Sequence, residues 1–252
     1  MDYPNILKYL GENWLTRQMA FIESKQWIEE VARDKMSLAP AMHLLAKIDE
    51  LISKLERVEG FDKWAKEAST SKSFEDCFFE IMIFENLYRK ADSFEIKPNS
   101  SINDKVPEAS ITKGNELFYI EAKKLEKIPP SVVNKVNTLL ARTRKKFAPR
   151  KGILFIGCFD FFHYEGDKPK AKKEFQELKA EVERKLRNHR ENSRILAVML
   201  TNIYIQTDME KSSFQKIYYL VPRPENLGGF NESKFREIFD VDGFIEDENT
   251  TP

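Results

Sequence analysis

The sequence predicts an α/β fold, in which a mixed β-sheet is flanked by helices and preceded by a helical N-terminal subdomain. From about residue 73 onward, predicted helices alternate with apolar runs of strand length, in the order helix, three strands, helix, strand, helix, strand, strand. Helices that cross over between buried strands cover the faces of a sheet. Residues 1–70 show only helical periodicity, so we expect a subdomain over 1–70 and an α/β domain over 71–252.

The composition predicts an ordered globular protein without a global attraction to nucleic acid. Hydrophobic residues make up 41% of the 252 residues, and 41 basic residues match 41 acidic ones. A nucleic-acid site must therefore come from local charge asymmetry. Two cysteines cannot form a disulfide framework or a zinc site. Neither a signal peptide nor an apolar stretch of membrane-spanning length is seen, so we expect a cytoplasmic protein with no membrane contact.

The N-terminal region is expected to form helices without a catalytic pattern. Apolar residues recur at spacings of three and four from Ile6 to Val31, and again from Leu44 to Leu55 after a break at 37–40. Gly60 is expected to end the second of these helices. The sequence leaves their role open between capping the site, forming a homodimer and contacting a partner.

The α/β region begins with a predicted helix over 73–90, in which Ser73 is the N-cap and Asp76 completes a variant of the capping box. Three strands follow, and a turn around Gly114 joins the last two. Crossover helices and buried strands complete the domain. The predicted ranges are 93–97, 106–112 and 117–123 for the three strands, 131–147 and 168–191 for helices, 152–159, 194–205 and 216–221 for later strands, and 232–239 for a short helix.

The sequence Glu121-Ala122-Lys123 is the strongest candidate for chemistry. The chain contains six Glu-x-Lys tripeptides, so the pattern alone means little, but this one ends a predicted strand. Strand alternation places Glu121 and Lys123 on one face and Ile120 and Ala122 on the other. Two charges at a strand end are costly if buried, unless they pair or bind an ion. Glu108, at the start of the neighbouring strand, is expected to approach Glu121.

These residues resemble the PD-(D/E)XK nuclease superfamily. Its pattern is a glutamate on a helix, a Pro-Asp at a strand, and Asp/Glu-x-Lys on the next strand. Glu80 matches the helix position, Pro107-Glu108 the Pro-Asp, and Glu121-Ala122-Lys123 the last motif, within residues 73–160. The resemblance implies a restriction-endonuclease-like core and a metal-dependent nuclease. DNA is the favoured substrate, in restriction, defence or repair.

The resemblance also implies roles for the matched residues. Glu108 and Glu121 are expected to hold Mg²⁺, with Mn²⁺ as an alternative, and the backbone carbonyl of Ala122 is a further ligand. Glu80 is expected to complete the ligand set or to hold a metal-bound water. Lys123 is expected to orient the attacking water or to offset charge that develops on the phosphate.

Three alternatives stay open at this stage. Glu108 replaces the usual aspartate, and Asp104 is an alternative ligand four residues earlier. Glu85 rivals Glu80, because Glu85 lies nearer the centre of the apolar face of its helix; we prefer Glu80 for its Phe-Glu setting. Glu121 and Lys123 are otherwise explained as an exposed ion pair on an edge strand, which contributes little to stability.

A basic segment follows the proposed site. Between positions 123 and 151 there are ten lysines or arginines and one acidic residue. Such a local excess suits contact with a phosphate backbone, and the alternative is a solvated helix face. The residues predicted to contact nucleic acid are Lys124, Lys135, Arg142, Arg144, Lys145 and Lys146.

Two other classes of function compete with the nuclease. One is a catalytically inactive nuclease-like fold that binds nucleic acid or a protein. The other is an α/β interaction module in which the charged cluster is a surface ion pair. Convergence of Glu80, Glu108, Glu121 and Lys123 within about 4–6 Å of one point distinguishes these readings, because such a distance permits a shared metal and its water.

Overall fold

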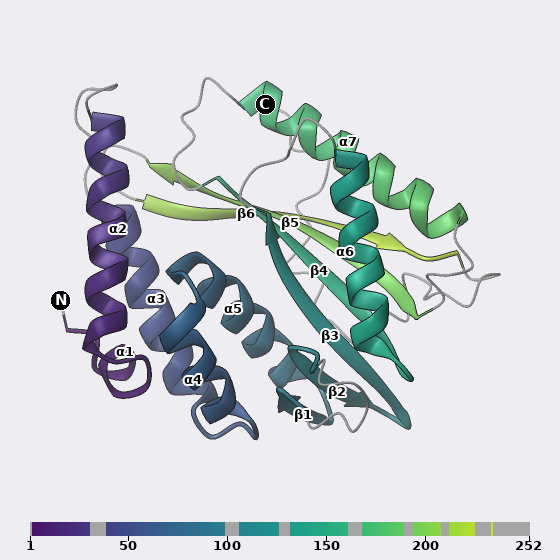
Figure 1. Cartoon of the computed structure of the whole chain (residues 1–252), viewed down its shortest axis with the longest axis horizontal. Coiled ribbons are helices and arrows are strands. Elements are labelled where there is room, and N and C mark those ends of the chain that lie inside the picture. Colours follow the sequence, from purple (N-terminus) through teal and green to yellow (C-terminus); the bar gives the residue numbers. More distant parts are fainter. Residues whose placement is uncertain are drawn as a thin grey trace.

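The predicted fold class is confirmed: a six-stranded mixed sheet lies between two layers of helices (Figure 1). The computed structural model describes residues 2–30, 39–98, 106–125, 132–160, 168–188, 194–207, 212–224 and 233. Within these residues, five helices precede the first strand and two more connect the later strands. The helices are α1 Pro4–Tyr9, α2 Glu12–Glu30, α3 Ala39–Leu55, α4 Phe61–Ser71, α5 Phe74–Lys90, α6 Val132–Phe147 and α7 Lys168–Asn188.

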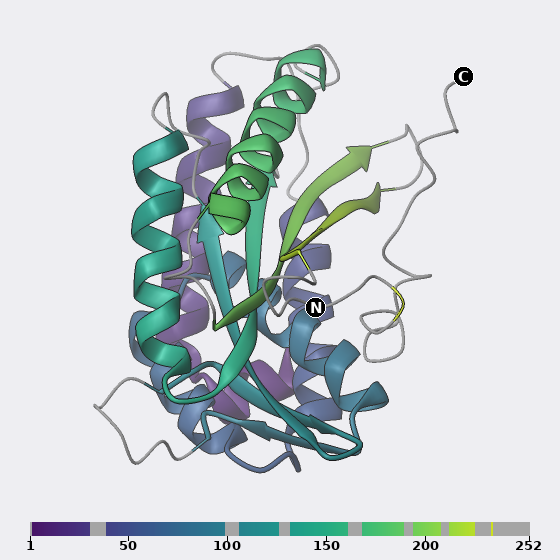
Figure 2. The same ribbon diagram turned by 90° about the vertical axis from the view of Figure 1, so that its right-hand side faces the viewer.

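The strands are arranged in the sheet in the same order as in the sequence. They are β1 Ser93–Ile96, β2 Ala109–Lys113, β3 Glu116–Leu125, β4 Lys151–Asp160, β5 Ile195–Thr207 and β6 Ser212–Pro222. The first three form an antiparallel meander, β3, β4 and β5 are parallel, and β6 is antiparallel to β5. Parallel neighbours need crossover connections, which α6 and α7 supply. Figure 2 shows the short strands β1 and β2 at one end of the sheet.

Each face of the sheet is covered by a separate hydrophobic cluster. One cluster contains Ile120 and Ala122 of β3 and extends through α1 to α5; the other contains Tyr119 and Leu125 and extends through α6 and α7. The alternation predicted for β3 is therefore confirmed. The first cluster runs without interruption from Tyr3 to residues of β5, across the predicted boundary at residue 70. None of the described helices has the length and apolarity needed to cross a membrane.

The structure differs from the sequence prediction around Gly60. The helix α3 ends at Leu55, and Gly60 is the N-cap of α4, with a φ of 81°. A Cβ atom at Gly60 would lie 1.6 Å from the carbonyl oxygen of Ile96, so the close approach of β1 requires glycine. The strand β2 also begins later than predicted, at Ala109. The helix predicted over 232–239 lies outside the described residues, apart from position 233.

The helix α5 is fixed at its N-terminus as predicted. The Ser73 hydroxyl accepts a hydrogen bond from the backbone N–H of Asp76, and the Asp76 carboxylate accepts one from the Ser73 backbone N–H. This reciprocal capping box satisfies two of the free N–H groups at the helix start. It also fixes the start of the helix that carries Glu80.

Candidate active site

The Glu121 carboxylate of β3 belongs to a cluster of charged side chains from several elements. Glu121 is fully buried, since β3 is an interior strand between β2 and β4. Its Oε1 atom contacts the Lys123 ammonium at 2.6 Å and the Lys146 ammonium at 2.7 Å. Its Oε2 atom has no hydrogen-bond partner in the part of the chain that the structure describes. The alternative of an exposed pair on an edge strand is therefore wrong.

Glu108 approaches Glu121 from the residue before β2. The backbone N–H of Glu108 donates to the Ile120 carbonyl, which continues the β2–β3 ladder and places Glu108 opposite Glu121. Glu108 Oε1 lies 3.4 Å from the Lys123 ammonium and 3.6 Å from that of Lys146. Through Lys123, the Oε1 atoms of the two glutamates lie within about 6 Å of each other, the sum of the two contacts. Asp104, the alternative ligand, lies outside the described residues.

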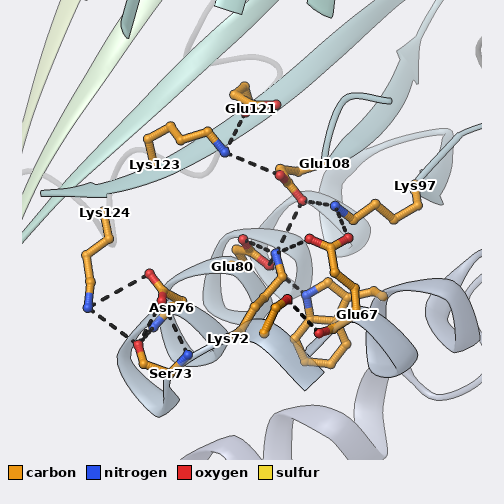
Figure 3. Close-up of polar contacts among 12 residues, drawn as sticks. Glu67, Lys72, Ser73, Asp76, Glu80, Lys97, Glu108, Glu121, Lys123 and Lys124 are labelled. Carbon is orange, nitrogen blue, oxygen red and sulfur yellow. Dashed lines mark hydrogen bonds and ion pairs between the residues drawn. The ribbon is translucent and has the colours of Figure 1, made fainter. Parts of the chain in front are cut away.

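The other oxygen of Glu108 contacts two lysines that the sequence analysis missed. Oε2 accepts a hydrogen bond from Lys97 and lies 3.7 Å from the Lys72 ammonium. Both lysines also contact Glu67 of α4, at 2.7 Å and 3.2 Å respectively (Figure 3). The sequence signals for them were weak. Lys72 directly precedes the N-cap of α5, and Lys97 directly follows β1 and ends one of the six Glu-x-Lys tripeptides.

Glu80 belongs to the same cluster, whereas Glu85 does not. Both oxygens of Glu80 accept hydrogen bonds from the Lys72 ammonium, at 2.6 and 2.7 Å, and the Trp64 indole N–H donates to one of them. Glu85 instead pairs with Arg89 at 2.6 Å and lies 3.9 Å from a lysine of α3. Of the two candidate acids on α5, Glu80 is therefore the one that approaches Glu108, through their shared Lys72.

Burial and charge act differently on the ionisable groups of the cluster. Burial is the largest influence on Glu80 and, with the nearby Glu108 charge, raises its pKa to about 7. Burial also tends to raise the pKa of Glu108, but Lys72, Lys97 and the two lysines near Oε1 outweigh it and hold that pKa below its ordinary value. For Lys123, Glu121 and Glu108 outweigh desolvation and raise the pKa. Glu108 is thus ionised and Lys123 protonated at neutral pH.

A pocket of about 730 Å³ opens beside these residues. Its lining includes Ala122, Glu80 and Glu108, whereas the fully buried Glu121 is not one of the lining residues. Lysines are the commonest charged residues of the lining. They are Lys63, Lys72, Lys97, Lys123, Lys124 and Lys146.

The predicted nucleic-acid contacts differ in their exposure. Lys135, Arg142 and Lys145 are exposed on α6, where spacings of seven and three residues place them on one side of the helix. Arg144 is half-buried. Lys146 points inward to Glu121, and Lys124 is nearly buried and pairs with Glu75 at 2.5 Å (Figure 3 shows Lys124 beside Ser73 and Asp76).

The acids of the cluster are separated by lysines. Among the described residues, no group of three histidine, cysteine, aspartate or glutamate side chains is close enough to form a metal site by itself. Glu108 and Glu121 share the ammonium groups of Lys123 and Lys146. Any metal at this position would therefore depend on these two carboxylates, backbone oxygens, water and a bound anion.

Comparisons of the chain with models of protein families, with curated proteins and with solved structures found no match. The resemblance to the PD-(D/E)XK superfamily therefore stays a prediction, based on Glu80, Pro107-Glu108 and Glu121-Ala122-Lys123.

Proposed function

We propose that this protein is a metal-dependent nuclease that hydrolyses phosphodiester bonds, with DNA as the favoured substrate and a role in restriction, defence or repair. The observation that carries the proposal is Glu121 Oε2, a buried carboxylate oxygen without a hydrogen-bond partner among the described residues. Such an atom costs free energy unless a ligand satisfies it. Its neighbours Glu108 and Lys123 are the residues that the PD-(D/E)XK pattern associates with it.

The residues present fit a hard divalent cation such as Mg²⁺ or Mn²⁺. Magnesium sites usually combine one or two carboxylates with water and substrate phosphates, so a third acidic ligand is not required. Glu121 supplies the unpartnered Oε2, and Glu108 supplies a second carboxylate that is ionised at neutral pH. Ala122 lines the same pocket and would offer its backbone carbonyl. Glu80, which accepts hydrogen bonds from Lys72 and Trp64, would hold a water molecule bound to the metal.

The lysines would act directly on the substrate. A bound metal would polarise the scissile phosphate and lower the pKa of the attacking water. Lys123 stays protonated beside Glu108 and Glu121, so it would donate to a phosphate oxygen or orient the water. Lys146 would hold Glu121 in place from α6.

The helix α6 would supply contacts to the nucleic-acid backbone. Lys135, Arg142 and Lys145 are exposed on one side of this helix, and Lys146 in its last turn reaches the cluster. Cations along a helix that ends at the site suit the regular spacing of phosphates. Nothing in these contacts distinguishes bases, so we expect backbone recognition from α6.

A second candidate is a binding module without catalysis, and one observation favours it. Four lysines contact Glu108, and two of them also contact Glu121, so protein cations compensate most of the carboxylate charge. A site that has lost its metal would retain such pairs as structural contacts. This reading leaves Glu121 Oε2 unexplained, which is why we rank it second.

The test combines metal titration and cleavage. Mn²⁺ and Mg²⁺ are titrated calorimetrically into the wild type and Glu121→Gln, and cleavage of mixed DNA and RNA substrates is assayed alongside. Glutamine keeps the size of the side chain and removes its charge. We expect the variant to lose metal binding and to lose cleavage by roughly 100-fold or more, because the metal would hold transition-state charge.

Glu85→Gln is the matched control, because Glu85 is a nearly buried acid of α5 that pairs outside the cluster. It should keep metal binding and cleavage. Absence of metal binding in the wild type, even with DNA present, would exclude the nuclease. If the wild type then still binds DNA, the binding module is the correct reading.

A further inference from the structure

Glu108 lies between two pairs of lysines, one pair at each of its oxygens. Lys123 and Lys146 contact Oε1, at 3.4 and 3.6 Å. Lys97 and Lys72 contact Oε2, the second of them at 3.7 Å. The pair at Oε1 is shared with Glu121, whereas the pair at Oε2 belongs to no part of the PD-(D/E)XK pattern.

Lys72 and Lys97 are held in place by backbone features on either side of the pocket. Lys72 is the C-cap of α4, where its backbone N–H bonds to Ala68, and it directly precedes the N-cap of α5. Lys97 has a φ of 49°, the only positive φ of a residue other than glycine among the described residues. Its backbone N–H donates to the Glu108 carbonyl at 2.9 Å. Non-glycine residues in this region are uncommon and store strain.

With all four carboxylates ionised, the charges of the cluster balance without a metal ion, and protonation of Glu80, whose pKa is about 7, leaves the cluster positive. Four lysines (Lys72, Lys97, Lys123 and Lys146) interact with four glutamates (Glu67, Glu80, Glu108 and Glu121). Most of these groups are buried or nearly so, and buried charge is costly when it is not compensated. A divalent cation added to a neutral buried cluster therefore brings uncompensated charge, unless an ammonium leaves Glu108 or an anion arrives.

We propose that Lys72 and Lys97 are positioning residues whose ammonium groups pair with Glu108 when no metal is bound. When the metal binds Glu108, these ammonium groups move to a phosphate of the substrate and pair with it instead. The inference rests on the proposed function and adds a consequence to it. Metal and phosphodiester each relieve the charge that the other introduces, so they bind with positive coupling. Coupling between two ligands is reciprocal, so each raises the affinity of the other by the same factor.

The pocket gives this exchange room. All four lysines line the same open space of about 730 Å³, into which Glu108 also faces. Lysine carries its charge on a flexible four-carbon stem, so an ammonium can leave a carboxylate for a phosphate without movement of the backbone. The fixed backbones of Lys72 and Lys97 keep both ammonium groups beside the pocket during such a change.

The experiment measures the affinity for Mn²⁺ by calorimetry, with and without a saturating phosphorothioate DNA oligonucleotide that resists cleavage. For the wild type we expect DNA to tighten Mn²⁺ binding by roughly tenfold or more, within the usual range of coupling between sites. For Lys97→Met we expect tighter Mn²⁺ binding without DNA and a coupling factor reduced to about threefold or less. Lys72→Met should change both quantities in the same direction.

A double variant separates competition at Glu108 from a change in total charge. Lys97→Met with Glu67→Gln removes one charge of each sign from two residues that contact each other. The net charge of the cluster is therefore unchanged, and neither residue leaves the other as an unpaired charge that would destabilise the fold. Competition at Glu108 predicts tighter Mn²⁺ binding without DNA in this variant as well. Lys63→Met is the control, since it removes a lysine of the same pocket and leaves the four lysine contacts of Glu108 in place.

Each outcome bears on one proposal. If the lysine variants bind Mn²⁺ as the wild type does and keep the same coupling, Lys72 and Lys97 are structural counter-ions and the inference is wrong. If only the single variants bind more tightly and the double variant does not, total charge is the cause and the exchange is again wrong. If the wild type binds no Mn²⁺ with or without DNA, the proposed function itself fails.

Discussion

Glu80 and Glu108 are buried carboxylates a short distance apart, yet their surroundings affect them in opposite ways. Glu108 contacts four lysines, which keep it ionised. Glu80 has the Lys72 ammonium and the Trp64 indole as donors, and burial together with the Glu108 charge raises its pKa to about 7. A carboxyl group with this pKa takes up a proton near neutral pH, whereas in the unfolded chain it does so near the ordinary value of 4.5.

This difference predicts how stability depends on pH. The raised pKa of Glu80 means that the folded state holds a proton which the unfolded state has lost between pH 4.5 and 7. The stability that Glu80 gains by holding this proton is therefore fully present below pH 4.5 and is lost as the pH rises through 7. From pH 5 to pH 8, we expect the wild type to lose roughly 1–3 kcal/mol of stability relative to Glu80→Gln.

Urea unfolding of both proteins at several pH values measures this change. Trp64→Phe, which removes the indole donor of Glu80 and adds no charge, serves as the control for loss of packing in the cluster. Parallel pH profiles for the wild type and Glu80→Gln would show that Glu80 is ionised throughout this range.

Individual site residues were predictable to the extent that they depend on local pattern. Strand alternation placed Glu121 and Lys123 on one face, and the structure confirms this, because Ile120 and Ala122 pack in the cluster on the other face. Lys72 and Lys97 were missed because their contacts with Glu108 span 36 and 11 residues of sequence. Contacts across such separations come from tertiary packing, and a single sequence contains no period that signals them.

At the scale of elements, hydrophobic periodicity and turn residues identified the helix α5, the hairpin of β2 and β3, and the helix α6. The separate helix α4 was not predicted, because Gly60 was read as a helix end when it is a helix start. Both positions favour glycine, and only the neighbouring strand distinguishes them. The helix missed in this way carries Glu67, and Lys72 directly follows it, which accounts for two of the three cluster residues that the sequence did not indicate.

The role of Gly60 can be tested by a pair of substitutions. Gly60 and Gly11 have nearly the same positive φ, 81° and 85°, but a Cβ atom at Gly11 meets nothing within 4 Å, whereas at Gly60 it clashes with Ile96. We expect Gly11→Ala to cost about 1 kcal/mol, the ordinary penalty of a left-handed alanine. Gly60→Ala should cost about 3 kcal/mol or more, because the junction of α4 and β1 must also move.

Chemical denaturation measures both values, and the difference between them isolates the close approach of β1 from the backbone penalty. Equal losses of stability in the two variants would mean that β1 moves away from Gly60 at little cost. The position of Lys97 at the end of β1 would then be less constrained than the structure indicates.

At the scale of the whole molecule, the N-terminal helices are part of the core that supports the site. The hydrophobic cluster on their side of the sheet includes Trp14, Trp64 and Phe84 together with residues of β3 and β5. Side chains from α4 also enter the charged cluster, through Glu67 and the Trp64 contact with Glu80. The predicted division at residue 70 therefore separates two segments of sequence that share one core.

Removal of the first segment tests this dependence. We expect a fragment of residues 71–252 to lose cooperative unfolding, because the apolar face of α5 would be exposed to water. Circular dichroism in urea and gel filtration report the loss, and a separate peptide of residues 1–70 should restore the transition when mixed with the fragment. A fragment that unfolds in two states at the midpoint of the full chain would establish an independent domain.

The neutral net charge of the whole molecule makes any binding of DNA a matter of local charge, and this leads to the last prediction. The exposed cations Lys135, Arg142 and Lys145 lie on one side of α6, and the ion pairs of the buried cluster involve other residues. Their combined replacement by alanine should weaken DNA binding and reduce the slope of log K against log salt concentration by about 2 to 3, because each phosphate contact releases roughly one counterion. Replacement of Lys8, Lys47 and Lys54, which belong to α1 and α3 on the opposite side of the sheet, removes the same charge and should leave the slope unchanged (Figure 1). Equal slopes in all three proteins would show that DNA does not contact α6. A slope reduced only in the α6 variant would show that the DNA backbone lies along this helix as it approaches Glu108 and Glu121.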